Sequence, residues 1–314
     1  MELRKDYLLD RWVVLATERK KRRKEFKKKE VEKKGKTCFF CPGNEATTPP
    51  EIGRVEENGK WIIRWFPNKF PAVRQEGDPI IKTHNEFFTF SDAYGNHEVI
   101  AECPEHDKQL WDLSKEHIKK ILYVYKDRIN DLTKDDNTKY VVIFKNHGGA
   151  AGTSLIHSHT QVASINLIPP IVSEEISASK ILDDCLYCNI INVEKDSDRR
   201  CFENNSFVAF APYASRFNYE VWIFPKMHVT NMNDLNDDEF GDLADILKKV
   251  LVKLKELDAA YNFFLHYAPE GENLHLHIEV TPRLATWAGF EFSSDIIINS
   301  VAPEDAAKFY RNEE

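Results

Sequence analysis

The sequence predicts an α+β fold made of two tandem repeats, each an antiparallel β-sheet with helices packed on it. Two observations predict the repeat. Each half carries a Cys-x-x-Cys pair, at 38–41 and again at 185–188, followed by a strand-like run, a single histidine and a leucine seven residues later. Each half then continues with a helical stripe and a strand that holds a His-x-His pair, at 157–159 and again at 275–277.

Length and charge limit the classes of function. The chain has 314 residues, of which 42% are hydrophobic, enough for one large domain or two ordinary ones. No apolar run approaches the roughly 20 residues that a membrane helix needs, and the N-terminus lacks the layout of a secretory signal, so we expect a cytoplasmic protein without membrane contact. A net charge of −8 argues against nucleic-acid binding. The basic run 20–36 is interpreted mainly as a solvated surface segment.

A helix is predicted in each half from an apolar stripe at helical spacing. The second stripe runs from Phe240 to Leu254, and Asn236 with Glu239 predicts a reciprocal cap at its start. The first stripe consists of Ile118, Ile121, Leu122, Tyr125 and Ile129. The isoleucine-proline-proline run within 166–181 is typical of a linker, which predicts domains at 1–168 and 169–314. About 25 extra residues in the first repeat are expected to form loops and an edge strand.

Each half also offers a complete set of metal ligands. A reducing compartment makes disulfides unexpected, so paired cysteines indicate a metal, and structural zinc takes four nitrogen or sulfur ligands. Because both sets fill four positions, we expect two closed, structural zinc sites. The predicted ligands are Cys38, Cys41, His106 and His157 in the first half and Cys185, Cys188, His228 and His275 in the second.

The segment 146–161 combines small residues, hydroxyls and imidazoles. Glycines such as Gly152 let a phosphate approach backbone amides, which with Ser154 can hold phosphoryl oxygens. His159 is predicted to be the nucleophile, because a neutral imidazole attacks phosphorus without a separate base. Residues two apart on a strand share a face, so metal-bound His157 would fix the aim of His159, and Gln161 would face the phosphoryl oxygens.

These motifs resemble the galactose-1-phosphate uridylyltransferases of the histidine-triad superfamily, over nearly the whole chain. The residues that carry the resemblance are 11–13 with Arg19 and Arg22, Cys38-x-x-Cys41, Asn68-Lys69-Phe70-Pro71-Ala72, His97-Glu98-Val99-Ile100, Glu105-His106, His157-Ser158-His159-Thr160-Gln161 and Gly289-Phe290-Glu291.

The resemblance implies two histidine-triad-like domains, the first with the catalytic motif and the first zinc site and the second with the other metal. It implies a ping-pong reaction in which His159 takes a nucleotide from a nucleoside diphosphate sugar and passes it to a sugar 1-phosphate. It further implies a homodimer with active sites at the subunit boundary. Arg19 and Arg22 would reach the phosphates, and the nucleotide pocket would be lined by Asn68, Asn146, Ser154 and Gln161.

The sequence departs from the family pattern in places. Ser158 stands where bacterial and animal members commonly have proline, and with the second cysteine pair it looks more like the plant branch that transfers adenylyl groups from ADP-glucose to phosphate. In bacterial members a glutamate matching Glu174 or Glu175 helps bind the second metal, which could be iron, and Cys185 with Cys188 should make it unnecessary here. Ile297 replaces a glutamine expected at the hexose. Glu291 stays a candidate acceptor for sugar hydroxyls, with a surface carboxylate as the alternative.

The main functional prediction is transfer of uridylyl between UDP-glucose and galactose 1-phosphate. Three alternatives remain. An ADP-glucose phosphorylase would use the same covalent chemistry with phosphate as acceptor, and a zinc-stabilised nucleotide-binding protein would have no activity. A dinucleotide hydrolase is disfavoured because Gln161 stands where the shorter histidine-triad hydrolases have a further histidine. His277, which matches His159 in the second repeat, is expected to be structural.

Overall fold

A computed structural model describes residues 2–6, 9, 12–15, 38–180 and 185–313. Its centre is a ten-stranded, wholly antiparallel sheet. The strand order across it is β10 (Arg200–Glu203), β11 (Phe207–Phe210), β12 (Val221–Pro225), β14 (His277–Pro282), β13 (Tyr261–His266), β8 (Tyr140–His147), β9 (His159–Ile165), β7 (His97–Ala101), β4 (Lys60–Pro67) and β3 (Gly53–Glu57). The predicted α+β class and the repeat are confirmed, since each repeat supplies five of these strands.

The two repeats are joined edge to edge rather than folded as separate sheets. Strand β8 of the first repeat pairs with β13 of the second over five residue pairs, from Tyr261 with His147 to Leu265 with Ile143. An unpaired strand edge exposes a row of backbone donors and acceptors, and the β8–β13 pairing satisfies both edges at once. The expected two sheets are therefore one continuous sheet.

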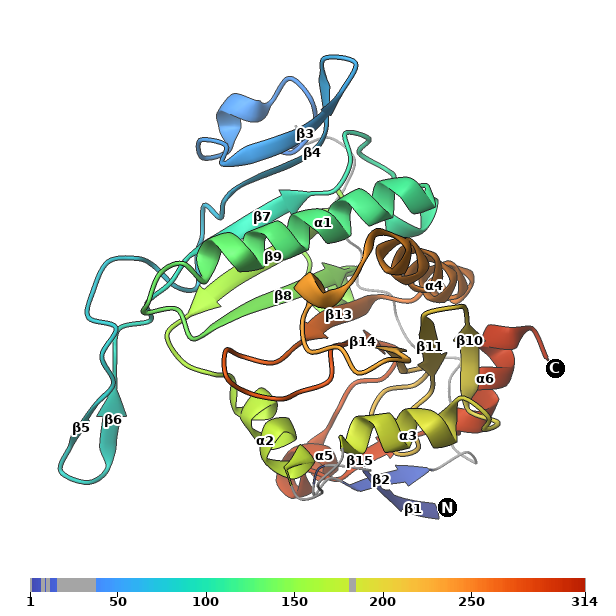
Figure 1. Cartoon of the computed structure of the whole chain (residues 1–314). Helices are drawn as coiled ribbons and strands as arrows, with labels where there is room; N and C mark the ends of the chain where they lie inside the picture. The colour runs from blue at the N-terminus through green and yellow to red at the C-terminus, as the bar shows by residue number, and fades with distance from the viewer. Residues whose placement is uncertain (1, 7–8, 10–11, 16–37, 181–184, 314) are drawn as a thin grey trace.

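Both predicted long helices cover the same face of this sheet (Figure 1). Helix α1 (Lys115–Leu132) packs on β8 and β9, and α4 (Asp237–Glu256) packs on β10, β11 and β12. The predicted cap is confirmed, because the Asn236 side chain accepts from the backbone of Glu239 at 3.0 Å while the Glu239 carboxylate accepts from the backbone of Asn236 at 2.8 Å.

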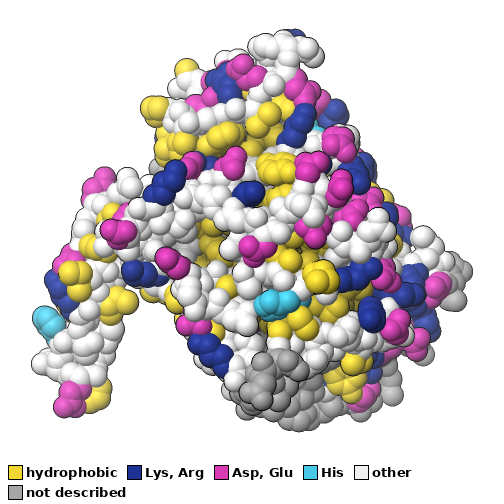
Figure 2. All heavy atoms as spheres, in the orientation of Figure 1, with side chains coloured by type: hydrophobic (Ala, Val, Ile, Leu, Met, Phe, Trp, Pro, Cys, Tyr) yellow, Lys and Arg dark blue, Asp and Glu magenta, His cyan; other side chains and the backbone are white. Residues whose placement is uncertain are grey.

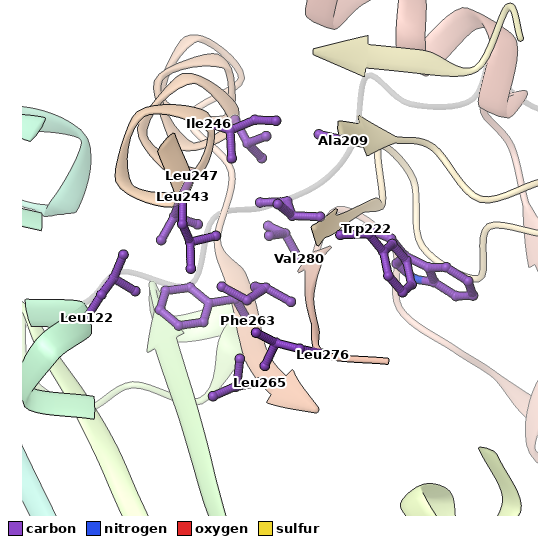
Figure 3. Packing of buried hydrophobic residues seen from close by; sticks show 14 of the residues in the cluster. Leu122, Ala209, Trp222, Leu243, Ile246, Leu247, Phe263, Leu265, Leu276 and Val280 are labelled. Carbon is purple, nitrogen blue, oxygen red and sulfur yellow. The ribbon is translucent and has the colours of Figure 1, made fainter. Parts of the chain in front are cut away.

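One hydrophobic core runs through both repeats between these helices and the sheet. Figure 3 shows Leu122 of α1, Leu243 and Leu247 of α4, and Phe263 of β13 pointing into it from different elements. Fully burying a side chain of this size contributes about 1.5–3 kcal/mol. The shared core therefore couples the folding of the two halves.

Shorter elements tie the ends of the chain together. Strands β1 (Glu2–Lys5) and β2 (Trp12–Leu15) form a small sheet with β15 (Ile297–Asn299), which comes from the other half. The segment expected to link the repeats contains helix α2 (Pro170–Ser179), in which Pro170 occupies the first helical position, where proline suits a helix. The remaining helices are α3 (Leu186–Glu194), α5 (Gly289–Ser294) and α6 (Pro303–Arg311). The boundaries 1–168 and 169–314 stay a prediction.

The extra residues of the first repeat include a hairpin, β5 (Lys82–His84) with β6 (Phe88–Phe90), which lies outside the ten-stranded sheet, whereas β3 and β4 occupy the places that β10 and β11 take in the second repeat. The hairpin projects from the body in Figure 2 and bears exposed aromatic rings, among them Phe87 and Phe88. Among the described residues, no helix is long and apolar enough to cross a membrane.

Candidate active site and metal centres

His159 is the first residue of β9, and its ring is buried, with 9% of the residue exposed. Its Nδ1 lies 2.8 Å from the backbone carbonyl oxygen of His157. A carbonyl oxygen can only accept, so Nδ1 carries the proton and Nε2 keeps its lone pair. This tautomer leaves Nε2 as the nucleophilic atom.

Burial, with help from the charge of Lys145, lowers the pKa of His159 to about 4. The imidazole is therefore neutral at pH 7. Neutrality is the state that attack on phosphorus requires, because a protonated ring has no lone pair on Nε2.

A cavity of about 440 Å³ opens beside His159. Its walls come from β4, β7, β9 and the glycine-rich turn, and they include aromatic rings suited to a nucleobase. The predicted site residues His159, Gln161, Asn68, Gly152 and Ser154 all line it, together with Phe39, Phe40, Phe66, Phe70, Val99 and Leu155. The structure therefore brings these five predicted residues together at one concave site.

Gln161 is oriented by a residue whose role the sequence did not reveal. The His97 Nδ1 accepts from the Ala72 backbone at 3.0 Å, so His97 Nε2 carries the proton and donates to Gln161 Oε1 at 3.0 Å. Asn68 also donates to that oxygen, at 3.4 Å. The Gln161 amide oxygen is thus occupied, which leaves its NH₂ group as the end able to donate to a ligand. His97 lies on a neighbouring strand, and no sequence spacing signals this contact.

The glycine-rich turn before His159 is tight and is held by its own backbone hydrogen bonds. Gly148 and Gly152 have φ values of +80° and +90°, and a Cβ on Gly148 would lie 2.7 Å from the Ala260 side chain, so glycine is required there. The amides of Ala151 and Gly152 donate within the turn, at 3.0 and 3.2 Å. These two amides are therefore engaged within the turn, and the expectation that backbone amides of this segment hold phosphoryl oxygens together with Ser154 stays a prediction. Ser154 still lines the cavity.

Asn146 and Glu291 lie outside the main cavity. Asn146 lines an adjoining cavity of about 160 Å³ that also reaches His159. Its Oδ1 accepts from Asn262 at 2.7 Å, and Asn262 also donates to the backbone of Ala151 at 2.9 Å. Glu291 is on α5, is buried, and accepts from the backbone of Ala288 at 2.9 Å, so it is not brought to His159 within this chain. Arg19 and Arg22 lie outside the described residues.

The first predicted ligand set is assembled in space. Nδ1 of His157 lies 3.6 Å from the sulfur atoms of both Cys38 and Cys41, and Nδ1 of His106 lies 3.4 Å from Cys41. Bond lengths of about 2.3 Å to sulfur and about 2.0 Å to nitrogen place tetrahedral ligands roughly 3.5 Å apart, as here. The Nε2 of His157 donates to the carbonyl of Cys103 at 2.7 Å, which aims Nδ1 at the thiols.

The second ligand set has the same arrangement. His275 Nδ1 lies 3.8 Å from Cys185 and 3.5 Å from Cys188, and His228 Nδ1 lies 3.5 Å from Cys188. The Nε2 of His275 donates to the carbonyl of Pro225 at 3.0 Å. Burial lowers the pKa of His275 to about 3, which keeps it neutral, as a metal ligand must be. Both clusters have the donor chemistry of a metal site.

A third group of potential ligands was not foreseen from the sequence. Glu175, His266, His277 and Glu279 are all buried, and one ligand atom from each lies within 4.8 Å of the others. Glu175 accepts from His266 Nδ1 at 3.0 Å and does not belong to the cysteine set. His277 repeats the geometry of His159, with Nδ1 2.9 Å from the carbonyl of His275, but faces this acidic group instead of the nucleotide-sized cavity.

These features define a class of protein. Two fused repeats, each with a Cys/His cluster, and one neutral histidine at the end of a glycine-rich turn are the arrangement of a nucleotidyltransferase. A family model described as "Galactose-1-phosphate uridyl transferase, N-terminal domain" matches residues 1–169, and one described as "Domain of unknown function (DUF4921)" matches residues 95–309. The chain belongs to the galactose-1-phosphate uridylyltransferase family.

Several individual proteins are similar over nearly their whole length. An ADP-glucose phosphorylase of Arabidopsis thaliana is 34% identical, covering 99% of this chain and 92% of that protein. A galactose-1-phosphate uridylyltransferase of Thermotoga maritima is 28% identical, covering 100% and 99%. The crystal structure of an Arabidopsis thaliana ADP-glucose phosphorylase with bound ADP-glucose superposes with a TM-score of 0.83 at 31% identity, covering 100% of this chain and 99% of that one.

Proposed function

We propose that this nucleotidyltransferase moves a nucleoside monophosphate from a nucleoside diphosphate sugar to a phosphate-bearing acceptor through a covalent intermediate on His159. The observation that carries the proposal is the position of His159 Nδ1, which lies 2.8 Å from the His157 carbonyl oxygen and so carries the proton, in a ring that opens onto a cavity of about 440 Å³. The lone pair of Nε2 is then available beside a cavity whose aromatic walls can hold a nucleobase.

The reaction proceeds in two displacements. Nε2 of His159 attacks the α-phosphorus, a phosphorus–nitrogen bond forms, and the sugar 1-phosphate leaves with the electron pair of the broken phosphorus–oxygen bond. An oxygen of the second acceptor then attacks the same phosphorus and releases the neutral imidazole. The NH₂ group of Gln161 is suited to donate to the phosphoryl oxygens as charge builds up on them.

The two Cys/His clusters are proposed to hold structural zinc, and the second could hold iron. A closed four-ligand site has no open position for a substrate, so the ion at Cys38, Cys41, His106 and His157 would brace the strand that carries His159. Such an ion supplies folding free energy and no reaction step.

Two donors compete within this proposal. Uridylyl transfer between UDP-glucose and galactose 1-phosphate is supported by the family model and by relatives of that name. Adenylyl transfer from ADP-glucose to phosphate is the second candidate, favoured by the 34% identity to an ADP-glucose phosphorylase against 28% to the Thermotoga maritima uridylyltransferase. Ser158 and the second cysteine pair point the same way.

A homodimer is proposed because Glu291 and the cavity are separated within one chain. If Glu291 accepts hydrogen bonds from sugar hydroxyls, it must do so in the cavity of a second copy of the chain. Sedimentation of the purified protein measures the oligomeric state, and a monomer at micromolar concentration with full activity would contradict this part of the proposal.

Labelling separates the candidates. The protein is incubated with UDP-glucose or ADP-glucose labelled at the α-phosphorus, denatured, and digested to locate the label. We expect an acid-labile, base-stable adduct on His159 with one of the two donors. Release by galactose 1-phosphate identifies a uridylyltransferase, release by inorganic phosphate a phosphorylase, and release by water alone a hydrolase. No adduct with either donor would favour the non-catalytic alternative.

A further inference from the structure

A buried ion pair lies directly beneath the strand that carries His159. Lys145 and Glu102 are 1% and 0% exposed, and Lys145 Nζ lies 2.6 Å from Glu102 Oε2. Moving two charges out of water costs several kcal/mol per ion, and a well-packed apolar pair of similar size is often as stable or more so. A pair in this position therefore calls for a reason other than stability.

The pair contacts the chain on both sides of the nucleophile. Lys145 Nζ donates to the backbone carbonyl of His159 and to Ser158 Oγ, each at 3.0 Å, so its three protons are all used. Glu102 accepts from the Thr160 hydroxyl at 2.6 Å and from the Ser158 hydroxyl.

The backbone of Glu102 also holds this segment, because its N–H donates to the Ser158 carbonyl at 3.1 Å. The hydroxyl of Tyr125, on α1, closes the network at 2.7 Å from Thr160 Oγ1. The three residues 158–160 are thus fixed by side chains that never touch the His159 ring, which faces the opposite side of the sheet.

The second repeat shows that the fold does not need this network. There the residues flanking His277 are Leu276 and Ile278, both buried. The strand partners of Ile278 are Leu265 and Ile223, which are also buried and apolar. The same strand arrangement is therefore built with hydrocarbon beneath the histidine that does not face the nucleotide-sized cavity. In contrast, charged groups and hydroxyls lie beneath His159, the histidine that faces the nucleotide-sized cavity.

We propose that Lys145 and Glu102 are positioning residues for His159, which hold the backbone of residues 158–160 so that Nε2 keeps its aim while the phosphorus–nitrogen bond forms and breaks. This rests on the proposed function. Small displacements of a reacting group are costly, since misplacement by about 1 Å can lower a rate about 10²-fold. Ser158 belongs to the same hydrogen-bond network, which explains why a hydroxyl residue lies between His157 and His159.

The test removes both charges together, so that no single charge is left buried. In Lys145→Met/Glu102→Leu we expect retained fold and metal content, a rate of covalent labelling of His159 lower by about 10²-fold, and a donor KM within about threefold of wild type, because the cavity walls are unchanged. The conservative single variant Glu102→Asp keeps Lys145 and a carboxylate at position 102. Its labelling rate should therefore be higher than that of the double variant.

A matched control exists on the same face of the sheet. Arg128 of α1 and Glu98 of β7 form another buried pair, with bonds of 2.8 and 2.9 Å, and Glu98 is paired with Val162 rather than with residues 158–160. Arg128→Met/Glu98→Met should lose comparable stability and keep the labelling rate within about threefold of wild type. Equal rate losses in both double variants would overturn the positioning role.

A second readout does not depend on any donor. The ¹⁵N signals of the His159 ring report which nitrogen carries the proton, and wild type should show a single form protonated at Nδ1. The Lys145→Met/Glu102→Leu variant should show a mixture of forms. If wild type is never labelled, the proposed function fails, and the ring signals still decide the positioning role. An unchanged single form in the double variant would overturn it.

Discussion

His157 and His159 are linked through the backbone as well as through the strand. The carbonyl oxygen of His157 lies 2.8 Å from Nδ1 of His159, while Nδ1 of His157 lies 3.6 Å from the thiols of Cys38 and Cys41. One residue therefore contributes to the metal cluster with its ring and sets the tautomer of its neighbour with its backbone. The metal cluster and the nucleophile can be tested separately, because different atoms of His157 serve each.

Replacing the nucleophile should leave the fold intact. Among the described residues, the ring of His159 makes a hydrogen bond with a backbone carbonyl and an edge contact with Phe40, neither of which involves a metal ligand side chain, so we expect His159→Ala to keep the metal content and the thermal midpoint close to wild type. Covalent labelling should vanish, with residual turnover lower by at least roughly 10³-fold. Metal analysis, thermal unfolding and labelling measure the three quantities. A variant that loses metal would assign His159 to the cluster instead.

Replacing one cysteine in each metal cluster should show that the two clusters affect labelling of His159 differently. Cys38→Ser opens the first cluster, and we expect one metal equivalent to be lost, a midpoint lower by roughly 10 °C, and labelling strongly reduced because His157 is released. Cys185→Ser is the matched control, since it opens the second cluster and should lower the midpoint similarly while keeping most of the labelling. Equal activities in the two variants would contradict the bracing of His159 by the first metal.

The amide of Gln161 should act in the transition state. Gln161→Ala removes one donor to the phosphoryl group, and we expect kcat to fall by roughly 10²-fold with a small change in KM. His97→Ala removes the donor that lies 3.0 Å from Gln161 Oε1 and lets the Gln161 amide rotate. We therefore expect a smaller decrease in kcat, of about tenfold. The double variant should be no worse than Gln161→Ala. Additive losses in steady-state kinetics would mean that His97 acts independently of Gln161.

Stability should fall with rising pH through a buried acid far from the nucleophile. Burial, with help from the charge of Glu279, raises the pKa of Glu220 from 4.5 to about 8. The folded state therefore binds more protons than the unfolded state between these values, so the free energy of unfolding decreases by up to about 1.4 kcal/mol per pH unit across this window. Glu220→Gln should flatten the decrease, whereas Glu270→Gln, at an exposed position, should not. Denaturant unfolding at pH 5 to 8.5 measures both slopes.

Much of this architecture was predictable because it repeats. The spacing of the cysteine pairs and the histidines predicts both ligand clusters, and the stripes ending at Ile129 and Leu254 predict both long helices. The fusion of the two sheets was not predictable, because the pairing of β8 with β13 leaves no signal in the spacing of either strand. The helix between the two repeats was not predicted, because proline interrupts a helix at interior positions but suits its first position, and Pro170 occupies the first position of α2.

The site itself was predicted unevenly. Residues within one motif, such as Gln161 and Ser154, are found at the cavity because strand and turn geometry place them there. His97 and Lys145 lie on other strands and Glu102 directly follows β7, and only the sheet order brings them to the strand of His159. The buried group around Glu175 and His277 likewise depends on contacts between segments that are distant in the sequence.

The bonds from Asn262 to Asn146 and to the Ala151 carbonyl have a consequence for how such a duplicated chain can evolve. A repeat that is released from catalysis usually accumulates substitutions or is deleted. Here the second repeat holds the glycine-rich turn next to His159 of the first repeat. Selection on nucleotide transfer thus extends into β13, and damage to Asn262 would be inherited as an enzymatic defect although Asn262 does not line the 440 Å³ cavity beside His159.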